Sequence, residues 1–321
     1  MRRIVIVLLS LILILGMMAT LAGCGDPPKH TTADNNGTTI ICTSFASYAL
    51  VTPLTENYLE DGGDSVVTVQ ILGKPGQDMH SYEPTAQDII SLANADVVVS
   101  TGAETWLDAA LKSSGNTAAQ VVSMMEACDV NATNHDHDHS HGDDSCALIG
   151  NDEHVWLSVD YAARIVSAIA DALKTADGKN ATVWEKRGEQ YRAELMNLHT
   201  EFREALQTAT KKTVVVADRH PFVYLFNDMG LDCVAAFPGC SSETSASFAT
   251  QTKLIEAVKS HELSYIFIIE GSDGKVAEVV AKETGAEILT LNSLQVVTDY
   301  ENTTYLAVMR QNLENLKKAL Q

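Results

Sequence analysis

The sequence predicts an α/β protein with two lobes, each built on a mostly parallel β-sheet flanked by helices, and one long helix that joins the lobes. Three observations support this prediction. Short apolar runs alternate with helix-like runs from residue 39 onward, a rhythm typical of parallel sheets covered by helices. The same rhythm returns from residue 211. Between the two stretches, about 30 residues read as one helix roughly 45 Å long, which is more than a single lobe needs.

The first lobe is assigned to residues 39–179. The run DVVVS has the continuous apolar character of a buried strand. Earlier in this lobe, Pro84 favours the start of a helix at residue 85, because proline is tolerated in the first turn. The expected strands are 39–44, 66–72 and 96–100, and the expected helices are 52–60, 85–93, 104–112 and 158–174.

The joining helix is assigned to residues 180–210, with Asn180 as its expected N-terminal cap. The second lobe is assigned to residues 211–321. Its expected strands are 213–217, 231–237, 264–269 and 287–291, and its expected helices are 222–229, 248–260, 274–284 and 300–320.

The N-terminus carries signals of export. Arg2 and Arg3 precede an apolar run at 4–15 that is too short for a comfortable membrane span. The string LAGC that ends at Cys24 resembles the lipobox of bacterial lipoproteins. The resemblance implies a signal peptide at 1–23, a lipid on Cys24 that anchors the chain to the outer face of a bacterial cell membrane, and a tether at 24–38. An uncleaved anchor helix is the alternative.

Composition narrows the class of ligand. The 321 residues carry a formal net charge of −20 and are 45% hydrophobic, so a sizeable core is available. A strongly acidic chain is a poor partner for nucleic acid, which needs clustered Lys and Arg. The charge is compatible with a cationic ligand, although a soluble, self-repelling surface explains it equally well. We expect a monomer.

Metal-binding side chains stand at the ends of several predicted elements. His80 follows the second strand, His154 precedes a helix, His220 follows the strand TVVVA, and Glu270 ends the strand SYIFIIE. Ligands of open α/β sheets bind outside the carboxyl ends of the strands. Imidazole and carboxylate are the ligands that zinc takes when cysteine is absent. The sequence therefore predicts one metal site in the cleft between the lobes.

A second metal-binding feature is the polar loop at 134–145. It contains His135, His137, His139 and His141 interleaved with acidic residues. Such a tract offers many transient nitrogen and oxygen ligands without fixed geometry, so we expect weak auxiliary metal contacts. The alternative is an inert solvated loop.

The strings PGQDMHSYEPTAQDI, ADVVVSTGAETWLD and DEHVWLSV, together with the acidic His-rich loop and the long helix, resemble the metal-binding lipoproteins of zinc and manganese ABC importers. These are ZnuA-like, cluster A-I substrate-binding proteins, and the resemblance runs from about residue 39 to the C-terminus. It implies two α/β lobes bridged by a rigid helix, one buried metal, and delivery to a membrane permease. It also implies that His80 and His154 are metal ligands.

The chain departs from the family at the third and fourth ligands. The family's second-lobe His position holds Arg219 here, with His220 one residue later. Either His220 reaches the metal by a local backbone shift, or Arg219 pairs with Asp218 or Glu243 and the site has fewer histidines. The family's late Asp position holds Asn292, so Glu270, Glu243 or water is left for the fourth ligand. The His-rich loop favours zinc, with manganese as the alternative.

Two rival functions follow from the same residues. A metallohydrolase would need an open zinc position and a general base, a role in which Glu153 beside His154 could serve. The nearest string to HExxH, which starts at His261, lacks the second His. The other rival is a surface adhesin that the metal only stabilises. We expect a binding protein, not an enzyme.

Overall fold

The computed structural model describes residues 37–130, 152–239, 241 and 245–321. Residues Gly37–Gln321 form one compact unit. The lipobox with Cys24, residues 24–36 of the expected tether, Glu243 and the His-rich loop with His135, His137, His139 and His141 lie outside the described residues. Gly37 and Thr38, which the prediction assigned to the tether, already belong to the first strand. None of the described helices is both long enough and apolar enough to cross a membrane.

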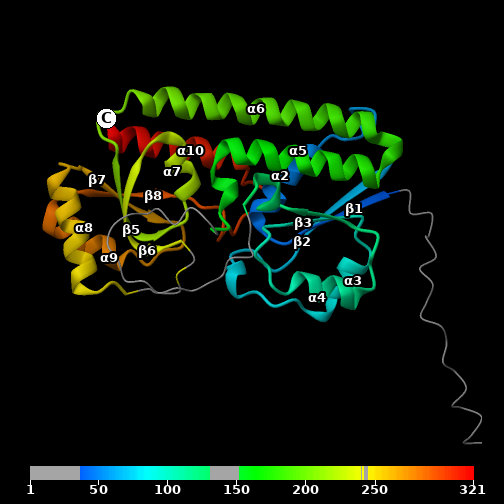
Figure 1. Cartoon of the computed structure of the whole chain (residues 1–321), viewed down its shortest axis with the longest axis horizontal. Helices are drawn as coiled ribbons and strands as arrows, with labels where there is room; N and C mark the ends of the chain where they lie inside the picture. Colours follow the sequence, from blue (N-terminus) through cyan, green and yellow to red (C-terminus); the bar gives the residue numbers. More distant parts are fainter. Residues whose placement is uncertain (1–36, 131–151, 240, 242–244) are drawn as a thin grey trace, which may run out of the picture. The chain divides into compact units, whose positions relative to one another are not determined.

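The first lobe is built on a parallel sheet of strands in the order β2-β1-β3-β4 (Figure 1). Both faces of β3 are buried, which is why its sequence VVVS is continuously apolar. The strands are β1 (Gly37–Cys42), β2 (Val66–Ile71), β3 (Val97–Ser100) and β4 (Gln120–Ser123), and the helices are α2 (Phe45–Thr55), α3 (Ala86–Ala93), α4 (Leu107–Ser114) and α5 (Val159–Ala176).

The second lobe repeats this topology with a parallel sheet in the order β6-β5-β7-β8 (Figure 1). In each lobe the chain leaves the first strand to one side and returns on its other side, which creates a switch point where ligands of such sheets bind. The strands are β5 (Thr213–His220), β6 (Asp232–Pro238), β7 (Tyr265–Ile269) and β8 (Glu287–Leu291), and the helices are α7 (Val223–Met229), α8 (Phe248–Ser260), α9 (Lys275–Thr284) and α10 (Tyr305–Leu320).

The long helix α6 (Ala181–Gln207) has 27 residues, which corresponds to about 40 Å. It packs against α5 of the first lobe and α10 of the second, so the green and red helices lie side by side in Figure 1. Trp184, Leu195 and Phe202, spread along its length, are fully buried in a core that includes residues of both lobes. The predicted fold class is therefore confirmed.

Several element boundaries differ from the prediction. The first helix begins at Phe45, not at residue 52, because Ser44 and Ser47 form a capping box at its start. The last helix begins at Tyr305 behind a Thr304 cap. Asn180 does not cap α6 with its side chain, and its amide instead donates to Asp64 and Asp177. Strand β4 was not predicted, and β5 extends to His220 itself.

Candidate metal centre

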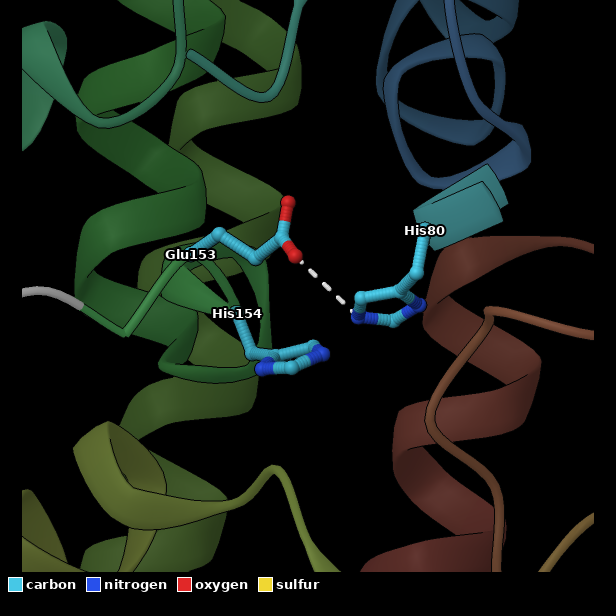
Figure 2. A group of neighbouring side chains, drawn as sticks. All are labelled: His80, Glu153 and His154. Carbon is cyan, nitrogen blue, oxygen red and sulfur yellow. Dashed lines mark ion pairs between the residues drawn. The ribbon is translucent and has the colours of Figure 1, made fainter. Parts of the chain in front are cut away.

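Three side chains of the first lobe converge on one point. Ligand atoms of His80, Glu153 and His154 all lie within 4.8 Å of one another. Figure 2 shows the ring of His80 facing Glu153 and His154, which come from a separate segment of the chain. The distance between the ring centroids of the two histidines is 5.5 Å. The structure therefore brings together the two histidines that the sequence singled out, and it adds Glu153.

His80 lies in a single helical turn, η1 (Met79–Ser81), that follows β2. Asp78 caps this turn, because its Oδ1 accepts hydrogen bonds from the His80 amide at 3.0 Å and from His80 Nδ1 at 2.6 Å. A carboxylate can only accept, so Nδ1 carries a proton and Nε2 is the nitrogen left to face a metal. Nε2 points at Glu153, whose Oε1 is 3.1 Å away.

His154 is held in the same way. It precedes the turn η3 (Val155–Leu157), and Asp152 Oδ1 accepts from its amide at 2.9 Å and from its Nδ1 at 2.7 Å. The side chain is fully buried. In both Asp-x-His strings, therefore, the aspartate fixes the ring and makes Nε2 the nitrogen suited to a metal. Such carboxylate–histidine pairs are characteristic partners of bound metals.

Glu153 is tied to the end of β3 and faces the histidines. Its Oε2 accepts a hydrogen bond from Thr101 Oγ1 at 3.2 Å, and its side chain is 16% exposed. Burial raises the pKa of this carboxyl, but the hydrogen bond from His80, the charges of His154 and His80 and the Thr101 contact outweigh burial and leave the pKa lowered. Glu153 thus offers an anionic oxygen to a cation. Sequence reasoning had treated it only as a possible base, although its place in the string Asp-Glu-His was the available signal.

His220 ends β5 in the second lobe and lies outside this group of three. It is 6% exposed, and neither ring nitrogen has a hydrogen-bond partner among the described residues. Its ring lies against Phe226, with 5.0 Å between centroids. Burial lowers the pKa of His220 to about 4; Asp152 opposes this shift and His154 adds to it. A neutral buried imidazole without a hydrogen-bond partner calls for an explanation, and metal binding is one that suits its ring nitrogens.

Gly239 lies close to His220 and to the hydrogen-bonded pair of Asp152 and His154. A Cβ on Gly239 would lie 2.8 Å from Asp152 Oδ2, 3.0 Å from the His220 carbonyl oxygen and 3.3 Å from His154 Nδ1. The chain of the second lobe therefore comes close to both histidine segments, at a position where a larger residue would push against the Asp152 carboxylate. Glu243 follows shortly after in the sequence, outside the described residues.

Among the described residues, the guanidinium of Arg219 pairs with Asp78 and not with Asp218, and the suggested partner Glu243 lies outside the described residues. The backbone N–H of Arg219 donates to Asp218 Oδ1 at 2.7 Å, but its guanidinium Nη1 lies 3.4 Å from Asp78 Oδ2 in the first lobe. The pairing of β5 with β6 shifts register between Val216 and Arg219. Such irregularities re-aim side chains near binding sites.

Glu270 and Asn292 organise a loop of the second lobe. The Glu270 carboxylate accepts from Ser293 N and Oγ at 2.7 and 2.6 Å, from Gln295 N at 3.0 Å and from Val296 N at 3.2 Å. Asn292 Oδ1 accepts from Leu294 N at 2.8 Å. Neither residue belongs to the group of three around His80.

The same loop reaches the first lobe on both sides of the site. Trp156 Nε1 donates to the Ser293 carbonyl at 2.9 Å, and Gly76 N donates to the Val297 carbonyl at 2.6 Å. Between these anchors, the side-chain amide of Gln295 is buried, with no hydrogen-bond partner among the described residues. Sequence reasoning did not single out Gln295, because nothing in its local pattern marks it.

These residues fit a divalent transition metal. Two oriented imidazoles, a carboxylate and a further buried imidazole supply the nitrogen and oxygen donors that zinc takes in four-coordinate sites. The orphaned ring nitrogens of His220 are the most specific sign, because a buried histidine without a partner is costly in an apolar setting.

Comparison with known proteins identifies the family of the chain. The model of the family described as zinc-uptake complex component A, periplasmic, matches residues 52–319. The high-affinity zinc uptake system protein ZnuA of Bacillus subtilis is 30% identical over 319 residues, which cover 97% of each chain. The zinc-binding lipoprotein AdcA of Streptococcus pneumoniae is 30% identical over 275 residues, and this chain spans 54% of its length.

Solved structures agree. The metal-dependent lipoprotein YcdH from Bacillus subtilis is 28% identical with a TM-score of 0.69, covering 88% of this chain and 99% of that one. Zn(II)-bound AdcA from Streptococcus pneumoniae is 26% identical with a TM-score of 0.69, covering 88% of this chain and 58% of that one. The expectation of a metal-binding solute-binding protein, and not an enzyme, is confirmed. The chain belongs to the family of zinc-uptake complex component A, periplasmic.

Proposed function

We propose that this chain is an exported lipoprotein that captures Zn²⁺ between its lobes and delivers it to the permease of an ABC importer. The observation that carries the proposal is the convergence of His80, Glu153 and His154, with each histidine oriented by its own aspartate. The zinc named in the descriptions of the family and its relatives supports the choice of ion.

The proposed ligands are His80, His154 and Glu153 from the first lobe, with His220 from the second. His220 is the proposed fourth ligand because it is buried beside the His154 pair and its ring nitrogens lack partners among the described residues. Glu270 is the alternative second-lobe ligand, but it must first give up the hydrogen bonds that hold residues 293–296. Glu243 and Asn292 stand behind it as further alternatives.

Zinc is favoured over manganese by the donor set. Imidazole nitrogens suit zinc, whereas manganese sites take more carboxylate oxygens. The His-rich loop at 134–145 adds four imidazoles to the supply of weak ligands, and we propose that it collects zinc. Metal analysis of the purified, tag-free protein tests the choice: one zinc per chain supports it, and manganese in its place contradicts it.

Anchoring is the second part of the proposal. Residues 1–23 are the proposed signal peptide, Cys24 the lipid-bearing residue and residues 24–36 the tether that leaves a monomeric binding protein at the outer face of the membrane. Cys24→Ser should move the protein from the membrane fraction to the soluble fraction. A substituted protein that stays in the membrane at the wild-type level contradicts the lipid anchor.

Delivery is tested in cells. A strain that lacks this chain should take up less labelled zinc, and His154→Ala expressed at the wild-type level should not restore uptake. Normal zinc uptake in the deletion strain would leave the surface adhesin as the better reading.

A further inference from the structure

Arg219 links the second lobe to the metal site of the first. It lies near the end of β5, and its guanidinium Nη1 is 3.4 Å from Asp78 Oδ2. The partners are 141 residues apart in the sequence, and Asp78 lies in the first lobe, in the loop between β2 and η1. Their side chains are 23% and 37% exposed, so the pair sits where the two lobes meet and is partly open to water.

Arg219 contacts the carboxylate oxygen of Asp78 that is not bonded to His80. Asp78 Oδ1 accepts from the amide and from Nδ1 of His80, while Oδ2 faces Arg219. Beyond His80, Nε2 faces Glu153 Oε1 at 3.1 Å. Arg219, Asp78, His80 and Glu153 therefore form one continuous chain of polar contacts from the second lobe into the metal site.

We propose that Arg219 is a positioning residue: through Asp78 it holds His80 in its metal-binding orientation and fastens the second lobe over the bound ion, so that release of the metal requires this pair to open. The inference rests on the proposed function. The family resemblance assigns a metal-binding histidine to the position of Arg219. In this chain, Arg219 would instead orient the ligand His80 without binding the metal itself.

Electrostatics alone predicts the opposite effect. A guanidinium near a divalent cation repels it, so loss of Arg219 by charge alone should strengthen zinc binding and slow its release. The positioning role predicts faster release, because the Asp78 carboxylate loses its second contact and the lobes lose a tie. The sign of the change in the release rate therefore separates the two accounts.

Replacement of Arg219 by alanine should leave the fold intact. Exposed ion pairs contribute little to global stability, and the Arg219 side chain makes no other hydrogen bond to the described residues. Arg310, which pairs with Glu201 at 3.5 Å on the outer helices, provides a matched control because its partner is not connected to the metal group.

The experiment measures zinc release from the loaded protein into an excess of a chromophoric chelator by stopped flow. Arg219→Ala should release zinc about tenfold faster, which is a difference of about 1.4 kcal/mol. Arg219→Lys, which keeps the charge and reach, should recover a large part of the wild-type rate. Arg310→Ala should release zinc at the wild-type rate.

Asp78→Asn provides the second arm. Its amide oxygen can still accept from His80, but its NH₂ group cannot accept from Arg219. Asp78→Asn should therefore resemble Arg219→Ala, and Arg219→Ala should have little further effect in the Asp78→Asn background. Release that is unchanged or slower in Arg219→Ala, or a full effect of Arg219→Ala in the Asp78→Asn background, overturns the inference. A wild-type chain that binds no zinc at all overturns the proposed function itself.

Discussion

The imidazole rings of His80 and His154 lie with their centroids 5.5 Å apart and their planes inclined by 43°. Ligand atoms of the two rings and of Glu153 lie within 4.8 Å of one another. Two neighbouring imidazoles can share one metal ion only through ring nitrogens that carry no proton. The relationship explains why both rings are clamped by aspartates.

Removal of either histidine should abolish tight zinc binding. At a zinc concentration about 1,000 times Kd, binding adds about 4 kcal/mol to the free energy of unfolding, which raises the Tm of a chain of this size by about 10 °C. His80→Ala and His154→Ala should show little of this zinc-dependent rise in a thermal melt. His261→Ala should keep it, because His261 contacts Thr213 of β5 away from the group. A full zinc-induced shift in both site variants contradicts the site assignment.

The aspartate behind each histidine should matter almost as much as the ligand. Asp152→Ala removes the acceptor that fixes Nδ1 of His154, so zinc affinity should fall about 10- to 100-fold. Competition titration against a chelator measures the change. Asp160→Ala, which breaks an i,i+4 pair with Arg164 on α5, is the control and should bind zinc normally. Equal affinities in the two variants would show that the ring orientation is not set by Asp152.

The His-rich loop should contribute only weak sites. Deletion of residues 134–144 should leave one tight zinc per chain, because His80, Glu153 and His154 lie outside it. Isothermal titration calorimetry should show the loss of the weak phase alone. Disappearance of the tight phase would instead make the loop part of the main site.

The sequence predicted the elements whose signals are local. Buried parallel strands such as β3 read as apolar runs because both faces are covered. The strings that contain His80 and His154 stand out in the sequence because each histidine lies two residues after the aspartate that orients it. Strand β4 was missed because its four residues, QVVS, are too short and too mixed in burial to stand out.

The rest depended on contacts between distant residues. Glu270 has the local pattern of a ligand at a strand end, but residues 23 to 26 positions later use its carboxylate to hold their loop. Arg219 finds its partner 141 residues away, so no local pattern could have placed it against Asp78. His220 was expected after its strand, yet a register shift in β5 carries the strand on to include it.

His220 should lower the stability of the metal-free protein and strengthen zinc binding. Its buried ring nitrogens lack partners among the described residues, and a buried unsatisfied polar group costs about 1–3 kcal/mol. His220→Phe, which keeps a ring against Phe226, should therefore raise the free energy of unfolding of the metal-free protein by about 1 kcal/mol and weaken zinc binding. Urea unfolding and chelator competition measure the two effects. Lower stability together with unchanged zinc affinity would mean that His220 is a packing residue.

If His220→Phe keeps zinc affinity, Glu270 is the next residue to test. Glu270→Gln should lower the stability of the metal-free protein, because the carboxylate accepts from three backbone amides and a hydroxyl. An additional loss of zinc affinity would identify Glu270 as the second-lobe ligand.

Acid should destabilise the metal-free protein through His220. The pKa of this buried ring is about 4, below the value of about 6.5 expected in the unfolded chain. Between these values the unfolded chain binds a proton that the folded chain refuses, so the free energy of unfolding falls as the pH falls from about 6.5 to about 4. The full loss from this one group is about 3 kcal/mol. Urea titrations of the metal-free wild type and His220→Phe at pH 7 and pH 4.5 should show a smaller acid loss in the variant. Equal losses in both proteins would mean that His220 takes up its proton as easily when folded as when unfolded.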